Sequence, residues 1–122
     1  MRSSVDSAKD ALAEKMESVF RLAGIKVRFT GGYSGWAPNA SSPILAAMKK
    51  VYKDMFDKEP LVMAIHAGLE CGILAGAYPH WDMVSMGPTL LSPHSPDERA
   101  HIPSVQKVWD LLKEVLKNIP EK

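Results

Sequence analysis

Two short segments, 61–65 and 82–86, limit what this chain can fold into more than any other feature. Leu61 to Ile65 is a continuous apolar run, and 82–86 is a second strand candidate; both are typical of strands buried on both faces. Helical patterns alternate with them from residue 42 onward, which favours an α/β layered sheet. Two central strands leave sheet edges that need partners. The chain therefore either pairs with another copy or is part of something larger.

The N-terminal pattern predicts one helix followed by one strand. Residues 7–23 carry an apolar stripe at three- and four-residue spacing: Leu12, Met16, Val19, Phe20 and Ala23. Ser7 and Asp10 can form a capping box, and Gly24 can end the helix. Residues 25–29 then alternate apolar and polar side chains, the pattern of a half-exposed strand.

Three further helices are expected. Ser42-Pro43 opens the strongest of them, with Ser42 as its cap. Its apolar stripe is Ile44, Leu45, Met48, Val51, Tyr52, Met55 and Phe56. A short helix ends near Gly76, and the last helix covers about 103–119. The buried side expected for the last helix is Val105, Val108, Trp109, Leu112, Val115, Leu116 and Ile119.

Composition excludes several classes of function. The net charge of +1 comes from 15 basic and 14 acidic residues that are well mixed, so nothing points to nucleic acid or an anionic membrane as partner. No apolar run approaches the roughly 20 residues of a membrane span. The start of the sequence lacks a signal-peptide core, and the single cysteine, Cys71, fits a reducing compartment. We therefore expect a cytoplasmic protein.

Chemically versatile residues follow both strand candidates, where open α/β sheets gather their binding sites. After the first come His66, Gly68, Glu70 and Gly72, whose glycines let the backbone approach a ligand. After the second comes His94, between two prolines that stiffen its loop.

Each candidate also has a purely structural explanation. A lone loop histidine is commonly a solvated side chain, and Glu70 could merely complement a helix dipole. Cys71 with His66 would fit a thiol hydrolase, although structural cysteines are commoner than nucleophilic ones.

A resemblance to a known family bears on the choice between these functional and structural explanations. Four stretches are similar to the C-terminal third of bacterial aminoacyl-histidine dipeptidases: AIHAGLECG at 64–72, WDMVS at 81–85, GPT at 87–89 and HSPDE at 94–98. Two earlier stretches resemble them as well: RSSVDS at 2–7 and GYSGWAPN at 32–39. The likeness spans essentially the whole chain in the right order.

The resemblance implies a fold and three site residues. The family is a group of two-metal peptidases with a catalytic α/β domain interrupted by a lid domain that also forms the dimer. Residues 1–31 would be the last helix and strand of the α+β lid, and 32–122 the C-terminal part of the catalytic domain with its partial layered sheet. His94 matches the final metal ligand, Arg2 the lid arginine that grips the substrate carboxylate, and Glu70 an acidic position near the metals that would hold the substrate amine.

The chain also lacks most of the family's site. The other metal ligands and the glutamate general base lie upstream of this segment in the family, so no catalytic residue is expected here. Zinc best suits such histidine and carboxylate ligands, with manganese or cobalt as alternatives. The leading hypothesis is a segment of a metal-dependent aminoacyl-histidine dipeptidase, inactive as an isolated chain and homo-oligomeric. The competing hypothesis is a non-catalytic binding or dimerisation module derived from the fold.

Overall fold

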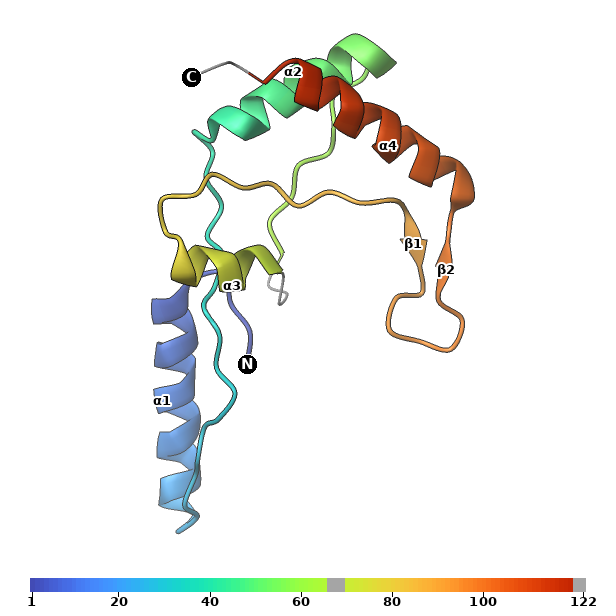
Figure 1. Cartoon of the computed structure of the whole chain (residues 1–122). Coiled ribbons are helices and arrows are strands. Elements are labelled where there is room, and N and C mark those ends of the chain that lie inside the picture. Colours follow the sequence, from blue (N-terminus) through green and yellow to red (C-terminus); the bar gives the residue numbers. More distant parts are fainter. Residues whose placement is uncertain (66–69, 120–122) are drawn as a thin grey trace. The chain divides into compact units, whose positions relative to one another are not determined.

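A computed structural model describes residues 1–65 and 70–119 of the chain (Figure 1). These residues contain α1 (Asp6–Leu22), α2 (Pro43–Phe56), α3 (Glu70–Ala77), α4 (Ile102–Lys117) and a hairpin of β1 (Leu90–Leu91) and β2 (Arg99–Ala100). None of the described helices combines the length and apolar content that crossing a membrane requires. The chain divides into two compact units: 1–39 with 62–81, and 40–61 with 82–122.

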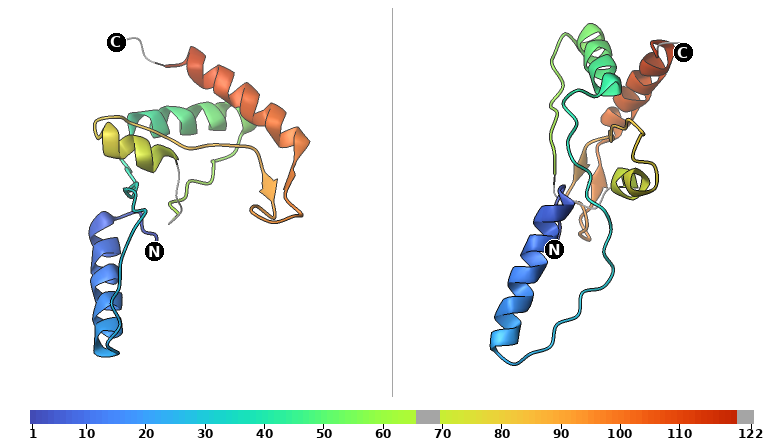
Figure 2. Two further views of the ribbon diagram at one scale, coloured as in Figure 1. Left: turned by 60° about the horizontal axis from the view of Figure 1, so that its bottom comes forward. Right: turned by 90° about the vertical axis from the view of Figure 1, so that its left-hand side faces the viewer.

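In the first unit, α1 ends in a hydrogen-bonded reversal. Gly24 has a φ of +72°, its N–H donates to the Arg21 carbonyl at 3.0 Å, and the Ile25 N–H donates to the Phe20 carbonyl at 3.0 Å. This pattern of a left-handed residue with two backward bonds satisfies carbonyls at the helix end and turns the chain. The predicted stop at Gly24 is confirmed. An extended segment then returns past the first half of α1 (Figures 1 and 2).

Glycines let three segments of this unit approach closely. A Cβ on Gly35 would lie 2.7 Å from the backbone of Ser4, and one on Gly72 would lie 2.9 Å from the Ser34 carbonyl oxygen. Both distances are far shorter than the contacts that real Cβ atoms make. The start of the chain, residues 34–36 and α3 therefore meet backbone to backbone at positions that only glycine can occupy without a shift.

The second unit is built on α2 and α4. Its buried apolar core consists of Val51 from α2 with Leu111 and Val115 from α4, flanked by Met48, Tyr52 and Phe56. As predicted, Ser42 caps α2 and Pro43 occupies its first turn: the Ser42 hydroxyl accepts from the Leu45 N–H at 3.0 Å. Asp82 adds a second acceptor, taking the Ile44 N–H at 2.9 Å.

The predicted strands are wrong for the part of the chain that the structure describes. Residues 25–29, 61–65 and 82–86 are extended but belong to no sheet, and Leu61 is 82% exposed. The sheet that does form is the short antiparallel hairpin of β1 and β2, inside a segment predicted as a loop. An apolar run becomes a buried strand only when neighbouring strands complete its hydrogen bonds. Residues 1–65 and 70–119 supply no such strand for the three segments.

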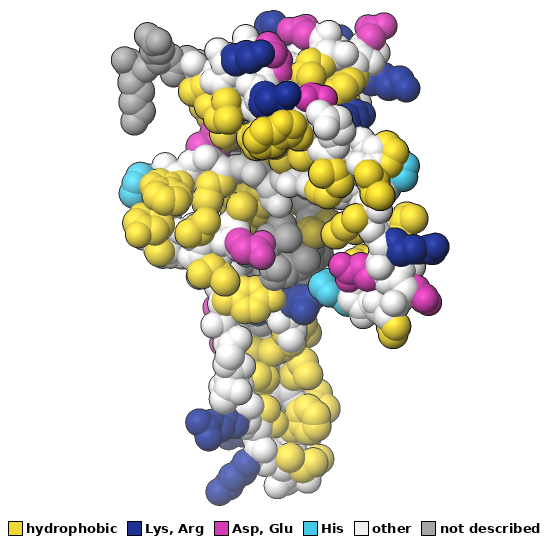
Figure 3. All heavy atoms as spheres, turned by 45° about the vertical axis from the view of Figure 1, so that its right-hand side comes forward, with side chains coloured by type: hydrophobic (Ala, Val, Ile, Leu, Met, Phe, Trp, Pro, Cys, Tyr) yellow, Lys and Arg dark blue, Asp and Glu magenta, His cyan; other side chains and the backbone are white. Residues whose placement is uncertain are grey.

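Two finer helix predictions need correction. Val5, not Ser7, precedes the first turn of α1, and no side chain caps it, so the capping box is absent. The apolar stripes of α1 and α4 are largely exposed: no residue of α1 is buried, and Trp109 in α4 is 55% exposed. Apolar side chains accordingly lie open over the surface of α1 (Figure 3). An apolar stripe predicts which face of a helix is suited to burial. It does not show which other element covers that face.

Candidate functional site

His94 lies in the loop that joins β1 to β2. The two strands pair Leu90 with Ala100 and Leu91 with Arg99, so the loop 92–98 has both ends fixed. His94 adopts a φ of +64°, a left-handed conformation that is uncommon outside glycine. Its backbone N–H donates to Oε2 of Glu98 at 2.7 Å. The loop therefore holds His94 by its backbone.

The imidazole of His94 is exposed and has no hydrogen-bond partner among residues 1–65 and 70–119. The loop thus fixes the backbone of His94, whereas nothing in the described residues fixes its imidazole. The purely structural alternative, a solvated surface histidine, is compatible with the same exposure.

Glu70 is the first residue of α3, in the other compact unit. Its side chain is exposed and makes no hydrogen bond or ion pair within the described residues. Position in the first helical turn is also what a purely electrostatic role toward the helix dipole would require. The preceding loop candidates, His66 and Gly68, lie outside the described residues.

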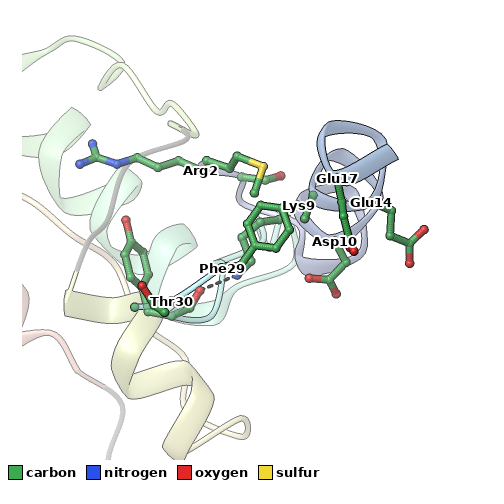
Figure 4. Close-up of a pocket in the computed structure, with 13 residues that line it drawn as sticks. Arg2, Lys9, Asp10, Glu14, Glu17, Phe29 and Thr30 are labelled. Atoms are coloured by element: carbon green, nitrogen blue, oxygen red, sulfur yellow. Dashed lines mark hydrogen bonds between the residues drawn. The ribbon is translucent and has the colours of Figure 1, made fainter. Parts of the chain in front are cut away.

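Arg2 lines a hollow with a volume of about 550 Å³ between the first half of α1 and residues 29–33. Figure 4 shows its side chain extending away from three carboxylates of the hollow, those of Asp10, Glu14 and Glu17. Within the described part of the chain, no carboxylate pairs with its guanidinium. Arg2 is therefore an exposed cation whose guanidinium can donate hydrogen bonds to the carboxylate of a ligand.

Cys71 follows Glu70 in α3 and is half-buried. Two further histidines, His80 and His101, are exposed, and neither side chain has a described partner in residues 1–65 and 70–119. His66, the partner predicted for Cys71 in a thiol hydrolase, lies outside the described residues, so that alternative stays a prediction.

Comparisons with known proteins decide between a chance motif and a true relationship. All 122 residues align at 48% identity with the cytosol non-specific dipeptidase of Escherichia coli (strain K12), of which they cover 25%. The crystal structure of an aminoacylhistidine dipeptidase from Vibrio alginolyticus matches 98% of this chain with a TM-score of 0.81 and 45% identity; the match covers 24% of that chain. The chain matches a segment of a dipeptidase. The resemblance found in the sequence is thus confirmed, whereas no family model matches.

The chain spans about a quarter of the length of these relatives. The structural match also supports a small α/β fold of helices with a two-stranded sheet. The predicted division at residue 31 into lid and catalytic parts is not tested by these matches and stays a prediction.

The described residues of the chain do not form a metal site by themselves. Residues 1–65 and 70–119 bring no three side chains of histidine, cysteine, aspartate or glutamate close enough to hold an ion. A zinc site needs three or four protein ligands, such as histidine and carboxylate side chains. The metal-ligand role predicted for His94 is therefore not tested by the described residues and stays a prediction.

The predicted gathering of Glu70 and His94 at one face is not tested, because the two residues belong to different compact units. Sequence analysis missed two anchoring carboxylates: Glu98, which holds the backbone of His94, and Asp6, which accepts from the Gly35 N–H at 2.7 Å. Glu98 follows His94 by four positions and Asp6 follows Arg2 by four, and both belong to motifs that carry the resemblance. An acidic residue at that spacing was the available signal.

Proposed function

We propose that this chain is the C-terminal part of a metal-dependent dipeptidase that hydrolyses aminoacyl-histidine dipeptides. The observation that carries the proposal is the 48% identity over all 122 residues to a dipeptidase of known name. The 0.81 TM-score to an aminoacylhistidine dipeptidase supports the same assignment.

Three side chains of this chain have proposed roles. His94 donates an imidazole nitrogen to one ion of a divalent metal pair, with zinc as the favoured ion. Arg2 binds the terminal carboxylate of the dipeptide, for which its planar guanidinium is suited. Glu70 holds the amino group of the substrate. All three side chains are exposed, so no structural contact within the described residues has to break before a ligand binds.

The chemistry that such a metal pair supplies is activation of water for attack on the peptide carbonyl. This chain contributes positioning to that chemistry. Arg2 and Glu70 would hold the two ends of a dipeptide by opposite charges, which selects for a short substrate with both termini free. The proton transfers belong to residues outside this segment, so no catalytic acid or base is assigned here.

A hybrid enzyme tests the proposal. The matching quarter of the Escherichia coli relative is replaced by these 122 residues, giving a hybrid dipeptidase. Hydrolysis of β-alanyl-histidine and of other aminoacyl-histidine dipeptides is then measured with added zinc or manganese. We expect metal-dependent turnover, which His94→Ala reduces together with zinc retention.

A second exposed histidine provides the matched control. His80→Ala removes the same side chain from a position with no proposed role and should leave turnover and zinc retention unchanged. Arg2→Met should raise KM for dipeptides far more than it lowers kcat, since it removes binding energy for the substrate carboxylate. A folded hybrid in which His94→Ala and His80→Ala behave alike would contradict the proposal.

The proposal extends to location and assembly. We propose a cytoplasmic homo-oligomer, in line with the word cytosol in the name of the Escherichia coli relative. The competing proposal, a non-catalytic module derived from the fold, is favoured by the absence of a complete metal-ligand set in the described residues. The genomic sequence upstream decides between them: a contiguous reading frame with the missing ligands supports the enzyme, and its absence supports the module.

A further inference from the structure

The loop 92–98 contains a carboxylate that bonds to the backbone of the proposed metal ligand. Oε2 of Glu98 accepts the backbone N–H of His94 at 2.7 Å, which is short for a bond from an amide. A charged acceptor makes such a bond roughly twice as strong as a neutral pair. Glu98 thus acts on His94 through the main chain and leaves the imidazole untouched.

The conformation of His94 makes this bond consequential. A φ of +64° is disfavoured for a residue with a Cβ, and it persists only where the surroundings hold it. Relaxation of φ to the usual negative range would rotate the Cα–Cβ bond relative to the incoming chain. The imidazole would then leave the direction in which the loop now presents it.

The rest of the loop fixes the position of Glu98 itself. Glu98 N–H donates to the Ser95 carbonyl at 3.1 Å, and the Ser95 hydroxyl donates to the Ser92 carbonyl at 2.8 Å. Ser92 is the second left-handed residue of the loop, with a φ of +51°. At the base, the His101 N–H donates to the Thr89 carbonyl at 2.9 Å.

All these bonds lie within residues 89–101. Among the described residues, the hydrogen bonds that hold the loop therefore come from its own hairpin. Because its geometry is local, the hydrogen bond can be studied in the 122-residue chain as well as in a larger enzyme.

We propose that Glu98 is a positioning residue that fixes the direction of the His94 imidazole for metal binding. This inference rests on the proposed function, in which His94 is a metal ligand. It differs from the alternative that Glu98 is itself a ligand. A hydrogen-bond acceptor can be either a carboxylate or an amide oxygen, whereas a metal ligand at this position needs the carboxylate charge.

Three variants separate these roles. Glu98→Gln keeps an oxygen that can accept the His94 N–H, and Glu98→Ala removes it. Asp97→Ala is the matched control, because it removes the neighbouring carboxylate, which has no described partner in residues 1–65 and 70–119. Each is made in the 122-residue chain and in the hybrid dipeptidase.

Two measurements are made on each variant. In the 122-residue chain, hydrogen exchange of the His94 amide is followed by NMR; Glu98→Ala should speed it by about tenfold. In the hybrid dipeptidase, zinc retention is measured against a chelator; Glu98→Ala should weaken it about 10- to 100-fold, as loss of an outer partner of a ligand does. Asp97→Ala should stay close to the parent in both measurements. Glu98→Gln keeps the acceptor oxygen but makes a weaker, neutral bond, so it should fall between the parent and Glu98→Ala in both.

The outcomes are distinguishable. If Glu98→Gln weakens zinc retention as much as Glu98→Ala while the His94 amide stays protected, Glu98 is a ligand and the inference is wrong. If Glu98→Ala leaves zinc retention unchanged while His94→Ala weakens it, His94 is a ligand that Glu98 does not position, and the inference is again wrong. If His94→Ala itself leaves zinc retention unchanged, the proposed function fails and the positioning role falls with it.

Discussion

The carboxylate of Asp6 accepts a hydrogen bond from the backbone N–H of Gly35 at 2.7 Å, across a sequence separation of 29 residues. The same carboxylate accepts from Lys9 Nζ at 2.8 Å, and Lys9 Nζ also donates to the Tyr33 carbonyl at 2.5 Å. Two side chains of the first turn of α1 thus tie the returning segment to the start of the chain. Arg2 precedes Asp6 by four residues, so these hydrogen bonds at Asp6 restrict the positions that the backbone of Arg2 can reach.

The first prediction concerns the titration of Asp6. The hydrogen bond from Lys9, followed by the one from Gly35, holds the pKa of Asp6 below its ordinary value of 3.8. Lys9→Met should raise that pKa toward 3.8 without fully reaching it, because the Gly35 N–H remains. Carbon-detected NMR of the Asp6 carboxyl as a function of pH measures the midpoint.

The sign of the effect on stability follows from the direction of this shift. A carboxyl whose pKa is lower when folded contributes stability above pH 3.8, and the contribution is lost as the pH falls through the lowered pKa. Asp110, whose pKa is lowered by the hydrogen bond from Lys113, serves as internal control. A Lys9→Met chain in which Asp6 and Asp110 both keep their parent midpoints would contradict the assignment of Lys9 as the main cause.

The second prediction concerns the close approach at Gly35. A Cβ there would lie 2.7 Å from backbone atoms of Ser4, and backbone cannot move aside as a flexible side chain can. Gly35→Ala should therefore lower the free energy of unfolding by about 1–3 kcal/mol. Gly32→Ala is the control, since nothing lies within 4 Å of its added Cβ. Urea unfolding of both variants measures the difference, and equal midpoints would refute the packing argument.

Helices could be predicted from the sequence because their pattern is local. Residues 7–23 and 103–119 were expected, and α1 (Asp6–Leu22) and α4 (Ile102–Lys117) form there. Strands could not be predicted in the same way. An apolar run such as 61–65 indicates that its side chains are suited to burial, but it does not indicate which strand would pair with it. That partner is not among the described residues, so the segment stays extended and exposed.

The site was predictable as chemistry but not as geometry. His94 could be found by its residue type, its flanking prolines and its motif. The left-handed backbone of His94 and its bond to Glu98 depend on the φ values of several loop residues together. No periodic pattern in a sequence encodes such a set of angles.

The third prediction is that the isolated 122-residue chain does not hydrolyse dipeptides. Two-metal hydrolysis needs several ligands on each ion, and the described residues bring no three candidate ligands together. β-Alanyl-histidine is incubated with the chain and with added zinc or manganese, and product histidine is measured. Metal-dependent turnover above that of a His94→Ala chain would disprove this expectation.

The fourth prediction separates metal chemistry from thiol chemistry. Cys71 is half-buried in the first turn of α3. If Cys71 were a nucleophile, Cys71→Ser would abolish turnover in the hybrid dipeptidase. We expect instead less than a tenfold change, because serine keeps the size of the side chain and the proposed mechanism does not use the thiol. Turnover by the parent that is blocked by iodoacetamide but unaffected by a chelator would favour the thiol mechanism.

The basis of the last prediction is the apolar stripe of α1. Leu12, Met16, Val19 and Phe20 lie on one side of the helix, and Val19 is 66% exposed. Apolar surface left in water costs roughly 25 cal/mol per Å², so a few hundred Å² gives a substantial drive to associate.

We therefore expect the 122-residue chain to form dimers or higher oligomers at least partly through residues 1–31. Replacing Met16 and Phe20 together by Asp places two charges in the stripe and should shift the chain toward monomer. Replacing Ser7 and Ser18 by Asp adds the same charge at exposed polar positions of the same helix and should leave the oligomer intact. Analytical ultracentrifugation at micromolar concentration, with circular dichroism to verify that α1 remains helical, distinguishes dissociation from unfolding. A parent chain that sediments as a stable monomer under these conditions would rule out association through α1. The apolar stripe would then remain exposed to water in a single copy of the chain.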